Sequence, residues 1–268
     1  MGIRRVESKE GREYFVDDLG VKLPSSTTVL NINEKIGLHS WYARTAVESF
    51  VSQLIYEMHI TGKGMMTKDF LECLDVPLMM KKAKERPEEA AKEGAEKGTI
   101  VHGLIEEYFR TGRMESVPPE FKEQVEKFYQ WLREYCVEPV GIEERVYSEK
   151  HRYAGTLDLV ANLSIPEHLG VKALPKKSRY LFVIDFKTAN GLYHDHKLQL
   201  ASYVHAWEER SGQTVDCGAM LRLDKYTGDM EWHIIERQVL DSFFEEFCRF
   251  VDIWWLRKER SLARRKKK

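Results

Sequence analysis

The sequence predicts an α/β fold, a mixed β-sheet flanked by helices with a helical region ahead of it. Three observations predict it. Helical periodicity dominates residues 39–136, apolar β-branched runs follow between residues 140 and 187, and a further helix separates these runs from two more strands. Helices that come first, followed by a strand-rich segment, are typical of an α/β core with an N-terminal helical elaboration.

The first part of the chain predicts one hairpin and several helices. The hairpin is expected over residues 12–23, around the turn formed by residues 17–20. Serine and threonine residues at 25–28 then offer good helix N-caps. Helices are expected at 39–61, 67–84, 88–112 and 119–136. Gly94 and Gly98 weaken the third of these as one continuous helix.

The second part of the chain predicts the sheet and its covering helices. Strands are expected at 140–148, 153–163, 179–187, 215–224 and 229–237, and helices at 195–211 and 240–260, with a loop insertion at 166–178. The chain then divides into residues 1–88, the N-terminal hairpin and helical region, residues 89–260, the core, and residues 261–268, a basic tail.

Composition indicates a globular protein with a highly charged surface. Of the 268 residues, 43% are hydrophobic and 32% are charged, and no apolar run is long enough to span a bilayer. The N-terminus has no signal-peptide pattern. Four scattered cysteines without a Cys-x-x-Cys pair suggest free thiols in a reducing compartment. We therefore expect a cytoplasmic protein of a bacterium, an archaeon or a virus, with no membrane partner.

Charge is distributed unevenly along the chain. Residues 257–268 contain eight basic residues and one acidic residue, which leaves 34 basic and 42 acidic residues in the remainder. A basic end on an acidic body can hold a phosphate backbone electrostatically. The alternative is a solvated helix end without a partner.

Two acidic positions on neighbouring predicted strands carry the chemical signal. Asp185 and Lys187 alternate on an apolar strand, so both side chains leave it on one face. Asp158 ends the preceding strand segment that begins at Gly155. Two carboxylates make an oxygen-rich site of the kind that Mg²⁺ or Mn²⁺ prefers. Taken alone, the Asp185–Lys187 pair is equally well explained as a structural ion pair.

Two further segments bring polar side chains toward the same strands. His102 follows Gly98 and Thr99 on the helix before the strands. Gln199 and Tyr203 lie four residues apart on the helix after them and therefore share a face.

These motifs, in this order, resemble the RecB-like branch of the PD-(D/E)XK nuclease superfamily. The resemblance covers residues 98–203 and rests on Gly-Thr-x-x-His, Asp, Asp-x-Lys and Gln-x-x-x-Tyr. This branch includes the nuclease domains of RecB and AddAB, CRISPR-associated exonucleases and the mitochondrial genome maintenance exonuclease. Residues 23–30 also resemble the Pro-Ser-x-Thr segment of mitochondrial-type and phage exonucleases. The resemblance implies a restriction-endonuclease-like core.

The resemblance also implies a role for each matched position. Asp158, Asp185, His102 and the backbone carbonyl of Phe186 would hold the metal ion, and Lys187 would orient the attacking water. Gln199 and Tyr203 would brace the site or contact DNA, and Thr99 would support it. Glu143, or its neighbour Glu144, stands where the family often has an acidic residue on the first core strand.

The function that these roles imply is a Mg²⁺- or Mn²⁺-dependent DNA exonuclease that prefers single-stranded ends and works in recombination, repair or replication, beside a helicase or recombination partner. The alternatives are a structure-specific or restriction-type endonuclease and an inactive DNA-binding module of the same fold.

Some relatives bind an iron–sulfur cluster through one early and three late cysteines. Here only Cys217 and Cys248 follow Tyr203, which argues against such a cluster.

The N-terminal helices combine aromatic and basic side chains, which can stack bases and follow a nucleic-acid strand. These residues are Trp41, Tyr42, Arg44, Phe50, Tyr56, Met58 and His59. Mainly because of the resemblance to these nucleases, the region 1–88 is expected to form a wall of a DNA channel. Ordinary amphipathic packing is the competing explanation.

Overall fold

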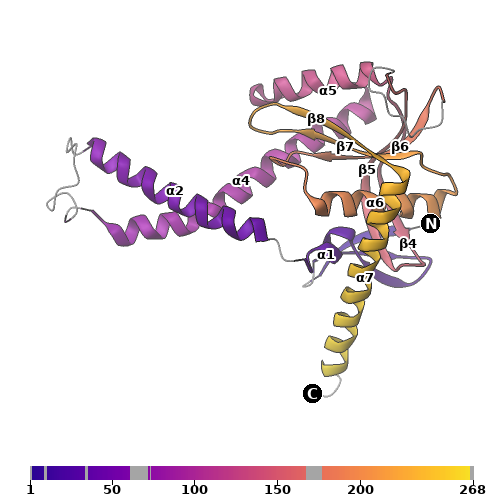
Figure 1. Cartoon of the computed structure of the whole chain (residues 1–268), viewed down its shortest axis with the longest axis horizontal. Coiled ribbons are helices and arrows are strands. Elements are labelled where there is room, and N and C mark those ends of the chain that lie inside the picture. The colour runs from indigo at the N-terminus through magenta and orange to yellow at the C-terminus, as the bar shows by residue number, and fades with distance from the viewer. Residues whose placement is uncertain are drawn as a thin grey trace. The chain divides into compact units, whose positions relative to one another are not determined.

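The computed structural model describes residues 2–8, 11–33, 36–60, 72, 74–166 and 177–265. The chain forms two compact units, one of Met1–Asn33 with Gly98–Lys268 and the other of Glu34–Lys97. Helix α4 (Val76–Thr111) contributes to both units, and the expected boundary between residues 88 and 89 lies inside it. The first unit contains both sheets (Figure 1).

A five-stranded mixed sheet forms the centre of the first unit. Its strands, in spatial and sequence order, are β4 (Glu138–Ser148), β5 (Tyr153–Leu163), β6 (Tyr180–Lys187), β7 (Cys217–Leu223) and β8 (Met230–Glu236). Strands β6 and β7 are parallel, and the other neighbours are antiparallel. The helix α6 (His194–Ser211) makes the crossover between the two parallel strands. The predicted α/β fold with a mixed sheet is therefore confirmed.

Helices cover both faces of this sheet (Figure 1). Helix α5 (Lys122–Glu134) and the final turns of α4 pack on one face, and α6 and α7 (Arg237–Arg265) pack on the other. The alternation along β6 explains the two cores, because Val183 belongs to the α6–α7 side and Ile184 to the α4–α5 side. Helix α7 continues beyond residue 260, where the sequence pattern predicted its end.

A second, three-stranded sheet packs beside β5. It consists of β1 (Ile3–Ser8), β2 (Gly11–Val16) and β3 (Val21–Pro24), all antiparallel, and short helix α1 (Ser26–Leu30) follows it. The hairpin of β2 and β3 was predicted, but β1 was not. The Tyr14 hydroxyl lies 2.8 Å from Oγ1 of Thr156, and Ser25 bridges to Ala154. These contacts hold β2 and the start of α1 against the N-terminal end of β5.

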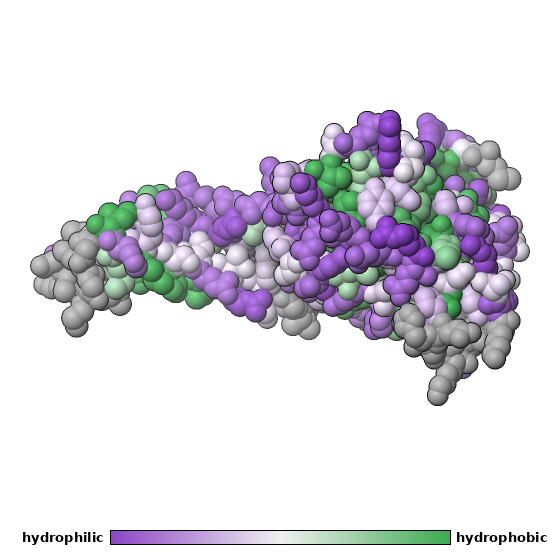
Figure 2. Space-filling view, turned by 90° about the horizontal axis from the view of Figure 1, so that it is seen from above, coloured by the Kyte–Doolittle hydropathy of each residue, from purple (hydrophilic) through white to green (hydrophobic). Residues whose placement is uncertain are grey.

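The second unit consists of α2 (Ile36–Ile60) and the first half of α4. Figure 2 shows apolar patches on it among predominantly hydrophilic residues. Its exposed apolar residues on α2 include Val47, Val51, Ile55 and Ile60. Part of the predicted helix 67–84, namely residues 67–71 and 73, lies outside the described residues, as do residues 167–176 of the predicted loop insertion.

Gly94 and Gly98, which were expected to weaken this helix as a continuous one, do not interrupt it. Helix α4 runs unbroken through both positions, and both glycines are buried. A Cβ at Gly98 would lie 2.7 Å from Oγ1 of Thr188. Close packing, which requires a residue without a side chain, therefore outweighs the low helix propensity of glycine at this position.

None of the helices in the described part of the chain combines the length and the hydrophobicity needed to cross a lipid bilayer.

Candidate functional site

The site lies where β5 and β6 separate. Their paired register ends at Leu159 and Ile184, and the next residues along the two strands are Asp158 and Asp185. The carboxylate of Asp158 accepts a hydrogen bond from the backbone N–H of Phe186 at 2.7 Å, in place of a strand partner. The end of the ladder thus leaves two carboxylates next to each other, each fixed by its strand.

Asp185 is the more deeply buried of the two carboxylates, with 2% of its surface exposed. Nζ of Lys187 lies 2.5 Å from its Oδ2 in an ion pair. The same oxygen has no partner with hydrogen-bond geometry among the described residues, so the contact is an ion pair at poor angles rather than an aligned hydrogen bond. Burial raises the pKa of Asp185, against the effect of Lys187 and together with that of Asp158.

Lys187 is held in place by α6. Its Nζ donates to Oε1 of Gln199 at 2.7 Å. The amide nitrogen of Gln199 donates to the hydroxyl of Tyr203 and to Oγ1 of Thr27, both at 3.0 Å. The carboxamide of Gln199 is therefore oriented from three sides, and it presents its oxygen to the ammonium. Burial, with the charges of Asp185 and Asp158 adding to it, raises the pKa of Tyr203, which keeps its hydroxyl protonated.

His102 approaches the site from α4. Its Nδ1 lies 3.9 Å from Oδ2 of Asp158, and its ring meets Phe186 edge-on with the centroids 6.5 Å apart. A separation of 3.9 Å is too long for a hydrogen bond, but two ligands of one metal ion can lie this far apart. The close packing at Gly98, one turn earlier, brings this part of α4 to the sheet. Thr99, expected to support the site, is exposed on α4.

Glu143 is the glutamate of β4 that faces Asp158. The register on both sides of it, Ile142 with Leu159 and Glu144 with Leu157, places it opposite Asp158. Its φ of +50° is strained for a residue with a side chain. Burial raises the pKa of Glu143 to about 7, and the charges of Asp158 and Glu106 act in the same direction. Glu144, the alternative at this position, is exposed.

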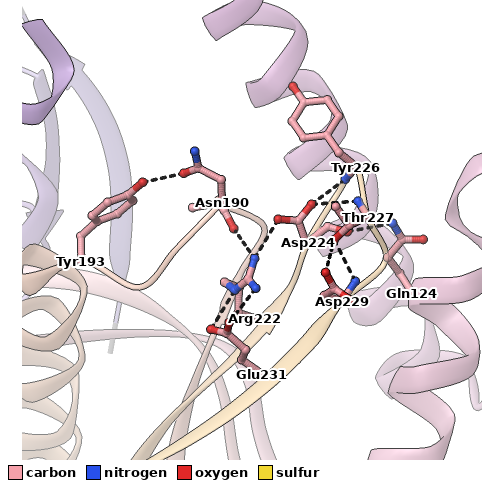
Figure 3. A network of polar contacts seen from close by, with 10 residues as sticks. Gln124, Asn190, Tyr193, Arg222, Asp224, Tyr226, Thr227, Asp229 and Glu231 are labelled. Atoms are coloured by element: carbon pink, nitrogen blue, oxygen red, sulfur yellow. Dashed lines mark hydrogen bonds and ion pairs between the residues drawn. The ribbon is translucent and has the colours of Figure 1, made fainter. Parts of the chain in front are cut away.

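A buried arginine that the sequence did not reveal braces the loop after Lys187 (Figure 3). Arg222 on β7 is in register with Lys187 and is 6% exposed. It pairs with Glu231 through two hydrogen bonds of 2.8 and 3.0 Å, and with Asp224 at 2.8 Å. It also donates to the backbone carbonyl of Ala189 at 3.2 Å. Figure 3 shows Tyr193, at the start of α6, closing the same loop through Asn190.

Thr27 is the second residue of the site without a role predicted from the sequence. It lies in the serine- and threonine-rich segment that the resemblance singled out, but that pattern gave no indication of its contact with Gln199. The neighbouring Ser26 hydroxyl accepts from Ser202 of α6 at 2.8 Å and lies 3.4 Å from the carbonyl of Ala154. The start of α1 therefore belongs to the frame of the site.

The donor set suits a hard divalent cation. Two carboxylates converge, one of them with a buried oxygen that lacks a hydrogen bond, and an imidazole lies across from the other. Within the described residues, however, no three His, Cys, Asp or Glu side chains surround one point closely enough to hold a metal ion. In this arrangement Lys187 neutralises Asp185 directly. Metal binding would therefore require these side chains to move from the positions described.

No family model and no curated protein matches this sequence. Among the solved structures that match is one described as "Crystal structure of SSO0001", with 13% sequence identity and a TM-score of 0.26. The match covers 46% of this chain and 55% of that chain, about half the length of each. A likeness of this extent decides neither the fold nor the function.

Proposed function

We propose that this protein is a divalent-metal-dependent deoxyribonuclease, an exonuclease that hydrolyses phosphodiester bonds from single-stranded ends. The observation that carries the proposal is the convergence of Asp158, Asp185 and Lys187 where β5 and β6 separate. A buried carboxylate with a raised pKa beside a cation is expensive for the fold, and such groups concentrate at functional sites. The order of motifs in the sequence supports the same proposal.

The chemistry assigns each residue a task. A bound Mg²⁺ or Mn²⁺ ion supplies charge neutralisation at the phosphate and a more acidic water. Asp158, Asp185, His102 and the Phe186 carbonyl would hold it. Lys187 orients the attacking water and offsets the charge that builds up on the phosphate. The water oxygen bonds to phosphorus as its proton passes to solvent, and the phosphorus–oxygen bond to the departing nucleotide breaks as the departing oxygen takes up a proton.

Gln199 keeps the ammonium of Lys187 near the point of attack. Its oxygen accepts from Nζ at 2.7 Å, while Tyr203 and Thr27 fix its orientation. Displacement of Lys187 from Asp185 toward the phosphate would free the buried Oδ2 for the cation. The same proposal includes a role in recombination, repair or replication, in which the protein acts beside a helicase. It also includes a cytoplasmic location and a DNA channel wall formed by residues 1–88.

A nuclease assay tests the proposal. Linear single-stranded DNA, linear duplex and closed-circular DNA, labelled at either end, are incubated with Mg²⁺ or Mn²⁺. Asp185→Asn is the inactive variant, and Asp18→Asn, the same change at an exposed turn, is the matched control. We expect metal-dependent digestion of linear DNA that is lost only in Asp185→Asn.

The other outcomes reject the proposal in distinct ways. Cutting of circles would make the protein an endonuclease. No cutting, with DNA bound equally by Lys187→Ala and the parent, would make it a binding module. Metal binding is followed separately by the rise in melting temperature with Mn²⁺, which should disappear in Asp158→Asn. An unchanged rise in that variant would remove Asp158 from the metal site.

A further inference from the structure

The C-terminal part of α7 carries a line of arginines on one side. Arg257, Arg260 and Arg264 are all exposed. Their spacing of three and then four residues places them on one face of the helix, within an arc of about 60°. The three guanidinium groups therefore point in a common direction from successive turns.

None of the three arginines has a carboxylate partner among the residues that the structure describes. By contrast, Arg222 on β7 and Arg237 at the start of α7 are each paired with two carboxylates. Lys258, next in sequence to Arg257, is paired with Glu13 at 3.1 Å and lies over the ring of Trp254. Three guanidinium groups without a carboxylate partner therefore stand together on one side of this helix.

The opposite side of the helix is fixed to the body. Trp254 is buried in the core of the α6–α7 side. The ring of Trp255 stacks under the guanidinium of Arg152 at 3.8 Å, and its indole N–H donates to the carbonyl of Arg152 at 3.0 Å. Figure 1 shows the C-terminal end of α7 continuing past the five-stranded sheet. The arginine line therefore stands on a helix whose direction is set by the fold.

We propose that Arg257, Arg260 and Arg264 form a binding face for the phosphate backbone of DNA, outside the candidate site. The face rests on the proposed function for the identity of its ligand. Seven residues of helix span about 10 Å, which matches roughly three nucleotides of one strand. Guanidinium groups bind phosphate oxygens through paired hydrogen bonds and remain charged at every physiological pH.

A membrane surface fits this helix less well than DNA does. A helix that lies on a membrane needs an apolar face opposite its basic face. On α7 that side carries Trp254 and Trp255, and both pack against the protein. The two tryptophans are therefore already used. The apolar residues of this part of α7 that stay exposed, Ile253, Leu256 and Leu262, are spread around the helix and do not form one apolar face.

Binding is measured by fluorescence anisotropy with labelled single-stranded and duplex DNA, in the presence of EDTA so that no DNA is cut. The salt concentration is varied between roughly 50 and 300 mM, the range over which phosphate contacts weaken. The test variant changes all three arginines to glutamine. One control changes all three to lysine, which keeps the charge. The second control changes Lys122, Arg133 and Lys150, all exposed and all outside the proposed channel wall, to glutamine, which gives the same net charge as the test variant.

We expect the glutamine variant to bind DNA about tenfold more weakly at 100 mM salt. The slope of log affinity against log salt concentration should become shallower by roughly two to three, because about that many counterions are no longer released. The lysine variant should keep most of the affinity, and the second control should keep the slope of affinity against salt. An unchanged slope in the glutamine variant, or equal losses of affinity in the second control, would overturn the inference. Weaker binding to vesicles of anionic lipid with unchanged DNA affinity would replace it with a membrane surface.

The failure of this inference and the failure of the proposed function can be told apart. If the parent binds DNA through the arginines but cuts no substrate with either metal, the proposed nuclease fails and the binding face stands. If the parent cuts linear DNA and the glutamine variant binds and cuts as the parent does, only the binding face fails. Circular dichroism and melting temperature confirm that each variant is folded.

Discussion

Gly155 offers the sharpest test of how the candidate site is packed. It lies on β5 directly against the ring of Tyr203. A methyl group there would lie closer to Cε1 of Tyr203 than van der Waals contact allows, 3.1 Å from Cδ1, and 3.5 Å from Oγ of Ser26. The ring is only 6% exposed and its hydroxyl holds Gln199, so it cannot move aside freely.

The expected cost of Gly155→Ala follows from these contacts. Overfilling a packed core costs about 1–3 kcal/mol, and a buried ring next to a strand places this site at the upper end. Alanine regains about 0.5–1 kcal/mol relative to glycine in a strand. We therefore expect a net loss of about 2 kcal/mol in the free energy of unfolding, measured by urea denaturation with an unchanged m-value.

Two backgrounds show whether the ring of Tyr203 is the cause. Tyr203→Phe keeps the ring carbons and should leave the cost of Gly155→Ala unchanged. Tyr203→Leu removes them and should reduce the cost to under about 0.5 kcal/mol, because the two residues are in contact and their effects are not additive. The same cost in all three backgrounds would refute the packing that we describe.

Three further perturbations test the buried charges. Lys187→Met should lower the free energy of unfolding by about 3–5 kcal/mol, because the Asp185 carboxylate stays buried without its cation; an unchanged urea midpoint would contradict this. Arg222→Gln should lower the free energy of unfolding by about 3 kcal/mol, because the buried carboxylate of Asp224 loses its cation. Glu231→Gln should lower it by under about 1 kcal/mol, because Glu231 is 54% exposed. Equal losses in the two variants would show that burial does not set the cost. Burial lowers the pKa of His205 in the folded state from the ordinary value of 6.5. Below pH 6.5 the unfolded state therefore binds a proton that the folded state does not bind. The free energy of unfolding falls as the pH drops, until the pH reaches the lowered pKa. Urea unfolding at pH 7.5 and pH 5.0 (chosen about a unit or more on either side of the ordinary pKa) should show a smaller fall in His205→Gln, and an identical fall would show that this histidine is not responsible.

The strands of the core could be predicted because their pattern is local. The β-branched and apolar residues of 179–187 and 153–163 leave little choice but buried strands, and the observed β6 and β5 differ from these ranges by at most one residue. Strand β1 gives no such signal, since Ile3–Ser8 alternates weakly and lies at a sheet edge. Its pairing with β2, over six residues, is what makes it a strand.

The parts of the site that escaped prediction depend on contacts between distant segments. Arg222 acquires its neighbours from the parallel register with Lys187, and no pattern around residue 222 indicates that register. The choice between Glu143 and Glu144 is decided by the positive φ of Glu143 and by the register of β4 with β5, which places Glu143 opposite Asp158. Asp158 and Asp185, in contrast, could be singled out because each ends or interrupts an apolar run, where a charge requires an explanation.

The question that remains for Asp185 and Lys187 is whether their ion pair serves the fold or the chemistry. A buried ion pair kept for stability should resist replacement, whereas one kept for chemistry should be replaceable by apolar residues with a gain of about 1–4 kcal/mol, because both desolvation penalties vanish. The double variant Asp185→Leu with Lys187→Met makes this replacement, and it also relieves the repulsion between Asp185 and Asp158. Gln199 keeps Thr27 and Tyr203 as partners in that variant. We expect the double variant to unfold at a higher urea concentration than the parent while losing all DNA cleavage. A lower urea midpoint would mean that the ion pair is a structural element, and the charges of this site would then need no chemical explanation.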